Sequence, residues 1–121
     1  MASSETANPA RPAPGLRLCA LADLADPGTR GFRFRAGSWL FAGFVLREGD
    51  EVRGFVDQCP HAAWPLAALD DRYLTRDGRN LICTGHGALF RLDGLCTAGP
   101  CAGLSLTKWP VVVEDGEVFT A

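Results

Sequence analysis

The feature of this sequence that most constrains its fold is a pair of short cysteine–histidine boxes. The chain of 121 residues contains only two histidines, and each lies within three residues of a cysteine. The first box is Cys59-Pro60-His61, and the second is Cys83-Thr84-Gly85-His86, with 21 residues (62–82) between them. Thiolates and imidazoles are side chains that bind zinc and iron–sulfur clusters. The fold must therefore bring two loops, distant in sequence, together at one metal site.

Two other interpretations explain the boxes less well. A buried cysteine or histidine without a ligand is the ordinary interpretation of any one such residue. It would have to apply to four residues at once, and it leaves the paired spacing unexplained. A structural zinc site usually pairs two cysteines or two histidines, whereas each box here joins a cysteine to a histidine. The one-residue gap of the first box is tight for a single tetrahedral ion, and it fits better if the residues of each box bind different irons.

Turn signals divide the chain into short segments that are typical of an all-β protein. Residues 31–35 alternate apolar with charged side chains, which predicts a half-buried strand. Asp115-Gly116 is a favoured pair for a two-residue hairpin turn, and it separates apolar segments at 110–114 and 117–120. Further strands are predicted at residues 16–21, 39–46, 52–56, 80–82 and 88–92. No segment has a helical period, so the pattern predicts a β-sandwich or barrel that displays both boxes on loops.

Length and charge limit the other possibilities. A chain of this length suits one domain with its own core. Residues 1–15 are rich in Pro and Ala without a period, which predicts a disordered tail before a domain at 16–121. The net charge of −2 argues against nucleic acid or an anionic membrane surface as a partner. No secretory signal and no run of about 18 apolar residues is present, so we expect a cytoplasmic protein.

The boxes and their surroundings resemble those of Rieske proteins. Pro65-Leu66 follows the first box, Gly87 and Phe90 follow the second, and Gly94-Leu95-Cys96, Gly99-Pro100 and the closing hairpin are similar to Rieske ferredoxins. The likeness is densest over residues 59–100 and looser over 16–120. It implies an antiparallel β-sandwich with a small cluster-binding subdomain at about 57–97. It also implies one [2Fe-2S] cluster per chain, with the two cysteines on one iron and the two histidines on the other. The ligands would be Cys59, His61, Cys83 and His86.

The chain departs from the high-potential respiratory members of that family. Those members carry an extra cysteine in each box, joined as a disulfide, where this chain has Trp64 and Gly85. They also carry a serine and a tyrosine that donate hydrogen bonds to cluster sulfurs, where this chain has Ala88 and Phe90. They are tethered to membranes as well. The resemblance therefore implies a ferredoxin of low reduction potential.

The same resemblance implies an electron carrier that is not itself an enzyme. Ring-hydroxylating oxygenases of the family add a mononuclear iron held by two histidines and a carboxylate, but both histidines of this chain are already used. We expect a shuttle that takes single electrons from a flavoprotein reductase to a terminal oxidoreductase such as an oxygenase, docking transiently at the cluster tip. Two alternatives stay open: a permanently bound electron-transfer subunit, and a redox or iron sensor.

The remaining cysteines, one tryptophan and several arginines have simpler interpretations. Cys96 and Cys101 are expected to be buried thiols below the cluster loop, and Cys19 an ordinary core residue. Trp64 follows the first box by three residues and is either a core anchor or an exposed contact for a partner. Most charges near the boxes are expected to be solvated, although a few can guide an acidic partner. These charges belong to Arg72, Arg76, Arg79 and Arg91.

Overall fold

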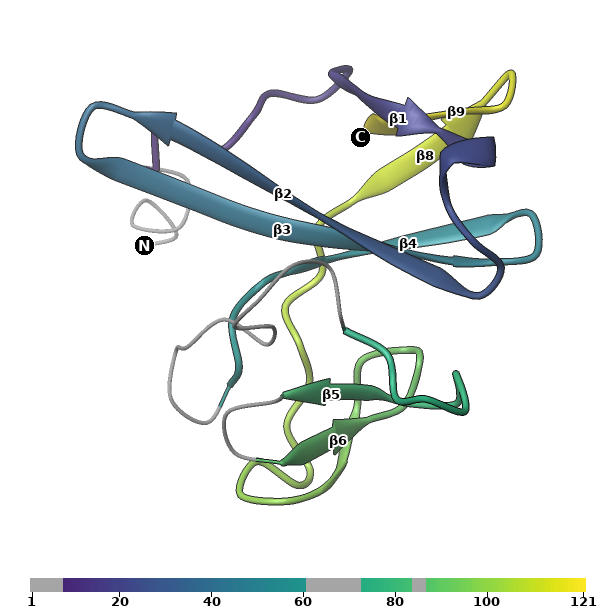
Figure 1. Ribbon diagram of the computed structural model, residues 1–121. Helices are drawn as coiled ribbons and strands as arrows, with labels where there is room; N and C mark the ends of the chain where they lie inside the picture. Colours follow the sequence, from purple (N-terminus) through teal and green to yellow (C-terminus); the bar gives the residue numbers. More distant parts are fainter. Residues whose placement is uncertain (1–7, 61–72, 84–86) are drawn as a thin grey trace.

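The fold is known from a computed structural model, which describes residues 8–60, 73–83 and 87–121 (Figure 1). Over these residues the regular structure consists of nine strands and one short 3-10 turn, η1 (Leu21–Asp23). No helix in this part of the chain is long and apolar enough to cross a membrane. The strands are β1 (Arg17–Ala20), β2 (Gly28–Ala36), β3 (Trp39–Glu48), β4 (Glu51–Val56), β5 (Leu81–Cys83), β6 (Ala88–Phe90), β7 (Cys96–Ala98), β8 (Val111–Glu114) and β9 (Glu117–Thr120).

The central sheet has the strand order β2-β3-β4 and is antiparallel throughout. Strands β2 and β3 pair along their whole length, from Gly28 opposite Arg47 to Ala36 opposite Trp39. The alternation predicted for residues 31–35 is present: Arg33 and Arg35 are exposed, and Phe32 and Phe34 are half-buried. Strand β4 pairs with the other side of β3, so β3 occupies the middle of the sheet and is the most buried of the three strands.

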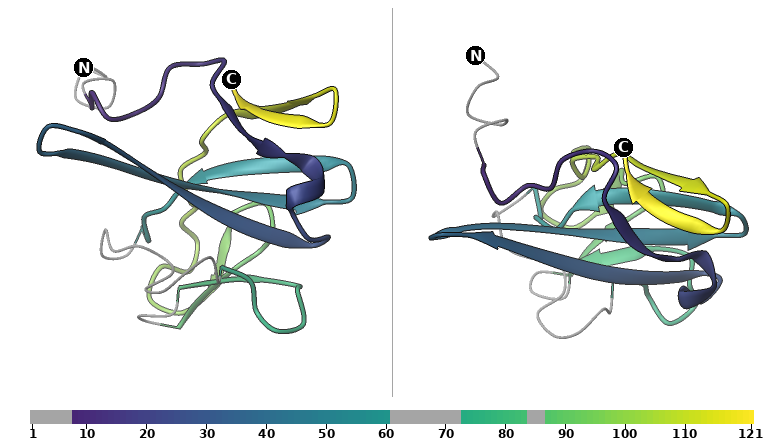
Figure 2. Two further views of the ribbon diagram at one scale, coloured as in Figure 1. Left: turned by 45° about the horizontal axis from the view of Figure 1, so that its top comes forward. Right: turned by 90° about the horizontal axis from the view of Figure 1, so that it is seen from above.

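A second sheet, with the order β1-β9-β8, packs above the central one (Figures 1 and 2). The hairpin predicted at the end of the chain is confirmed, with Glu114 opposite Glu117. Its turn residues Asp115 and Gly116 both have positive φ, 51° and 75°. Positive φ at both positions matches the turn to the right-handed twist of the strands.

Trp109 fills the space between these two sheets. Its side chain is buried, and its ring makes edge contacts with Phe32, Phe34 and Phe41 at centroid distances of 6.3, 6.3 and 5.4 Å. A Cβ added at Gly43 would lie 2.4 Å from a Trp109 ring carbon, so β3 needs a glycine opposite the indole. We call the buried residues around this ring the upper core: Ala10, Cys19, Leu24, Phe41, Val45, Trp109 and Val118.

A third, small sheet with the order β5-β6-β7 lies on the opposite side of the central sheet (Figure 1). Leu81 is opposite Phe90, and Cys83 is opposite Ala88. We call the buried residues between this sheet and β3–β4 the lower core; it contains four of the five cysteines. Its members are Phe44, Phe55, Cys59, Tyr73, Leu81, Cys83, Ala88, Phe90, Cys96, Cys101 and Leu106. This arrangement of antiparallel sheets confirms the predicted all-β sandwich.

Part of the segment expected as a disordered tail lies on the folded domain. Ala10 is buried, and the Asn8 side chain donates a hydrogen bond to the Leu40 carbonyl over 3.1 Å. The amide of Gly15 donates to the Thr120 carbonyl over 2.7 Å. Residues 8–15 thus gain backbone hydrogen bonds that composition does not reveal, and residues 1–7 lie outside the described part of the chain. The domain boundary at residue 16 stays a prediction.

Candidate metal centre

The first box begins where β4 leaves the central sheet. The Asp57 amide still donates to the Ala42 carbonyl of β3 over 2.9 Å, and the Gln58 amide then donates to Val56 over 2.9 Å. A hydrogen bond across so few residues is a tight turn. It directs the chain away from the sheet, and Cys59 enters the lower core with a side chain that is 0% exposed.

The second box begins at the last residue of β5. Cys83 is also 0% exposed and belongs to the same lower core as Cys59. Its carbonyl accepts a hydrogen bond from the Gly87 amide over 2.8 Å, so the residues on either side of the segment 84–86 are joined directly. Gly87 has a φ of 73°, a conformation that favours glycine. The two thiols that the sequence predicted as ligands are therefore buried in the same core.

A buried hydrogen bond between a tyrosine and an aspartate lies next to the first box in the chain. The Tyr73 hydroxyl donates to Oδ2 of Asp57 over 2.9 Å, and both residues are buried. The Tyr73 ring stacks on Phe44 with a centroid distance of 4.1 Å and an interplanar angle of 11°. These contacts connect the end of β4 to the segment that leads into β5. The sequence analysis assigned no role to Tyr73, although it is the only tyrosine of the chain.

Two further thiols lie in the lower core. Cys96 and Cys101 are unpaired and buried, as predicted, and the Cys101 thiol donates to the Cys96 sulfur over 2.9 Å. Burial, together with smaller contributions from the neighbouring sulfurs of Cys96 and Cys59, raises the pKa of the Cys101 thiol to about 12. Cys19 is buried in the upper core, as expected of an ordinary core residue.

Several predicted site residues lie outside the described part of the chain. These are His61, His86, Trp64 and Arg72. The structure therefore places the two cysteine ligands and not the two histidines. Of the other arginines named from the sequence, Arg76, Arg79 and Arg91 are exposed. Arg91 forms an ion pair with Asp93, and this pairing lowers the pKa of Asp93 to about 2.

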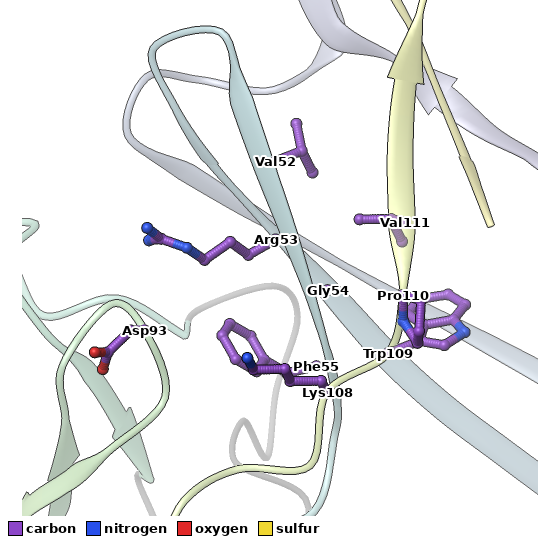
Figure 3. Close-up of a pocket in the computed structure, with 9 residues that line it drawn as sticks. All are labelled: Val52, Arg53, Gly54, Phe55, Asp93, Lys108, Trp109, Pro110 and Val111. Atoms are coloured by element: carbon purple, nitrogen blue, oxygen red, sulfur yellow. The ribbon is translucent and has the colours of Figure 1, made fainter. Parts of the chain in front are cut away.

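Two of the pockets that the described residues form differ in chemistry. One, of about 310 Å³, lies between β4 and the segment entering β8; Figure 3 shows Phe55 and Lys108 at one end and Val52 and Val111 at the other. The residues that line it contribute neither thiol nor imidazole, so it does not suit a soft metal. A second, of about 250 Å³, is lined by Gln58, Cys59, Pro60, Ser105 and Thr107, and so lies beside the first box.

The donor set that the structure does place fits an iron–sulfur cluster. The thiols of Cys59 and Cys83, from segments distant in sequence, are buried in one core, and thiolates are the ligands that hold such clusters. Comparison with known families matches residues 16–110 to the Rieske [2Fe-2S] domain. The chain belongs to this family. A [2Fe-2S] cluster is therefore its cofactor, and the zinc interpretation is set aside.

Individual relatives agree with this assignment. Ferredoxin CarAc of Metapseudomonas resinovorans is 34% identical over 107 residues, which are 88% of this chain and 92% of the relative. A chain in a solved complex of reduced oxygenase and oxidized ferredoxin of carbazole 1,9a-dioxygenase is 30% identical, with a TM-score of 0.63, covering 88% of this chain and 100% of that one. The ferredoxin of Sphingomonas yanoikuyae B1 is 27% identical, with a TM-score of 0.62, covering 88% and 96%. Since these relatives are ferredoxins, this Rieske protein is an electron carrier and not itself an enzyme.

Proposed function

We propose that Cys59, His61, Cys83 and His86 hold the cluster. The burial of both cysteines in the lower core supports the thiolate half of this set. The two histidines are the only imidazoles in the chain, and each follows a cysteine ligand closely. In Rieske centres two histidines replace two cysteines on one iron, which accounts for a set of two thiolates and two imidazoles.

We further propose that the protein takes single electrons from a flavoprotein reductase and passes them to a terminal oxygenase. The observation that carries this proposal is the near-complete mutual coverage with ferredoxins, one of them in a complex with its oxygenase. When bound, the cluster supplies a one-electron couple. The chain's own residues hold it at a fixed, dry site: the tyrosine–aspartate pair anchors the first box and the three-stranded sheet β5-β6-β7 carries the second. Docking is transient, at the cluster tip, in the cytoplasm.

Metal and sulfide analysis tests the assignment. The purified protein is expected to be red-brown and to contain about two irons and two acid-labile sulfides per chain. Preparations with one zinc and no iron would contradict the proposed ligand set. Rapid mixing of the loaded protein with a reduced flavoprotein reductase tests the direction of electron flow, and a protein that stays oxidised there would contradict the proposed role.

The reduction potential is expected in the lower part of the Rieske range, which spans about −150 to +300 mV. Ala88 and Phe90, both buried beside the second box, have no side-chain donor, whereas hydroxyls there would stabilise the negative charge that reduction adds. Ala88→Ser and Phe90→Tyr are each expected to raise the potential by some tens of millivolts, about 1 kcal/mol or more. Serine is the easier fit because it adds one atom.

Protein-film voltammetry on the wild type and both variants measures these shifts. Ala10→Ser and Phe41→Tyr are matched controls, because they place the same new hydroxyls in the upper core. Both controls are expected to keep the wild-type potential. If neither test variant moves the potential upward, or if the wild type already lies near the top of the range, the low-potential interpretation is wrong.

A further inference from the structure

The end of the β2–β3 hairpin projects beyond the strands of the other two sheets (Figures 1 and 2). In this part of the hairpin Arg33 is opposite Ala42, and Arg35 is opposite Leu40. Opposite residues of an antiparallel pair have their side chains on the same face of the sheet, so these four share one face. We call it the hairpin face. Phe44 of the lower core lies on the same face, so the hairpin face is on the side of the sheet that carries the two boxes.

Two positive charges on the hairpin face have no ion-pair partner among the described residues. Arg33 and Arg35 are both exposed, and neither pairs with a carboxylate in the described part of the chain. Arg17 and Arg91, in contrast, are each paired with a nearby carboxylate. The apolar side chain of Leu40, which is 49% exposed, lies between the two strands' arginines and the hairpin turn. A chain with a net charge of −2 thus has a local surface that is both basic and apolar.

A pocket of about 430 Å³ joins the hairpin face to the first box. Leu40 and Ala42 line it from the hairpin, and Asp57 and Gln58 line it from the segment that leads into Cys59. Gln58 also lines the pocket of about 250 Å³ beside the first box, so the two pockets adjoin. Asp57 is only 6% exposed and accepts a buried hydrogen bond, so its carboxylate is not part of the surface that a partner would contact. A partner on the hairpin face would therefore lie beside the first box.

We propose that the hairpin face binds an acidic surface of the flavoprotein reductase. The inference rests on the proposed function, which supplies the reductase as the electron donor. Guanidinium groups pair with carboxylates through two parallel hydrogen bonds, and protein interfaces surround an apolar centre with polar contacts of this kind. An acidic surface with an apolar centre therefore complements Arg33, Arg35 and Leu40 in both charge and polarity.

The change of charge on reduction favours the reductase over the oxygenase as the occupant. Reduction adds one negative charge at the boxes, and this charge repels an acidic surface that lies beside them. An acidic partner consequently binds the oxidised protein more tightly than the reduced one. An electron donor requires this order, because it must bind the oxidised carrier and release the reduced one, whereas an acceptor requires the opposite order. The hairpin face therefore adds a contact for the reductase to the docking at the cluster tip.

Isothermal titration calorimetry measures the dissociation constants of the oxidised, cluster-loaded protein for the reductase and, separately, for the terminal oxygenase. Both partners are purified from the source organism by their electron exchange with the wild type. Arg33→Glu and Arg35→Glu are each expected to weaken reductase binding about five- to tenfold at low ionic strength and oxygenase binding less than about twofold. In about 1 M salt, where the Debye length is about 3 Å, the effect on reductase binding is expected to fall below about twofold.

Arg30→Glu is the matched control for charge. Arg30 is exposed on the same strand, but its guanidinium lies 5.5 Å from the centre of the Phe32 ring, on the opposite face of the sheet from Arg33. The control variant has the same net charge as each test variant. It is expected to keep the dissociation constant for the reductase within about twofold of the wild-type value.

Leu40→Ala tests the apolar part of the hairpin face. It is expected to weaken reductase binding about threefold at low and at high salt alike, because burial of apolar surface does not depend on charge screening. Leu16→Ala is its matched control, since Leu16 is similarly exposed, at 42%, but precedes β1 in the second sheet. The control is expected to bind the reductase as the wild type does.

The outcomes separate this inference from the proposed function. A wild type that no reductase of the source organism reduces contradicts the proposed function, and the docking proposal with it. If the wild type is reduced but the test variants all bind the reductase as tightly as it does, the docking proposal is overturned and the electron-transfer role stands. Equal weakening in Arg30→Glu overturns the docking proposal as well, because net charge would then explain the effect. Weakening that is confined to the oxygenase overturns the choice of the reductase as the occupant.

Discussion

Replacing Cys59 with alanine is expected to abolish cluster binding. The wild type should contain about two irons per chain, and the variant close to none. Cys59 is fully buried in the lower core, so its thiolate cannot be replaced by water without opening that core. The loss removes one of only two thiolates in the proposed set. Iron and sulfide analysis, with the visible spectrum, measures the effect.

Two further variants make this result specific. Cys19→Ala deletes a buried cysteine of the upper core and is expected to keep both irons. Cys101 is buried in the same core as Cys59 and is a candidate to replace the missing ligand, so Cys59→Ala is also combined with Cys101→Ala. Full iron content and an unchanged spectrum in the double variant would exclude Cys59 from the ligand set. Partial binding in the single variant that disappears in the double one would show that Cys101 substitutes for it.

The sequence predicted the strands well wherever local chemistry sets the structure. The closing hairpin follows from Asp115-Gly116, because the turn needs positive φ at both positions and few other pairs tolerate it. The alternation of apolar and charged residues at 31–35 follows from a strand with one buried and one exposed face. The first strand, predicted at 16–21, is shorter in the structure, where Leu21 begins the 3-10 turn η1. Ends of elements depend on contacts with the rest of the fold, which local patterns do not contain.

The parts that sequence reasoning missed are long-range contacts. Strand β7 (Cys96–Ala98) has only three residues and pairs with β6 through an irregular register. Its sequence therefore has no alternation of apolar and polar residues from which a strand could be predicted. The Tyr73–Asp57 hydrogen bond joins residues that are 16 positions apart, and no local pattern links them.

The cysteine–histidine boxes, in contrast, could be recognised from the sequence alone. Their spacing was informative because a metal site demands particular side chains at particular intervals, whatever the scaffold. The structure brings Cys59 and Cys83 into one core, and the family match independently identifies a [2Fe-2S] domain. The positions of His61 and His86 stay a prediction, since both lie outside the described residues. The residue types and their spacing thus predicted the candidate ligands, and the structure was needed to show which residues surround the two cysteines.

Trp109→Ala is expected to destabilise the protein more than any other single substitution in the upper core. Trp109 is the largest buried side chain of the described residues, with three aromatic rings against it. Truncating a buried tryptophan to alanine costs about 3–5 kcal/mol. Collapse of the cavity is restricted because the Trp109 backbone amide is hydrogen-bonded to the Gly54 carbonyl over 2.9 Å, which fixes the backbone before β8 against β4.

Thermal unfolding followed by far-ultraviolet circular dichroism measures this effect on the cluster-loaded protein. A loss of this size is expected to lower the Tm by more than about 10 °C. Trp39→Ala is the matched control: Trp39 is 52% exposed at the β2–β3 turn, and its removal is expected to change stability by no more than about 0.5 kcal/mol. Because Trp109 lies in the upper core, the variant should still bind two irons below its Tm. Equal Tm values for the two tryptophan variants would show that the sheets do not depend on this ring, and loss of the cluster at low temperature would show that the two cores are not independent.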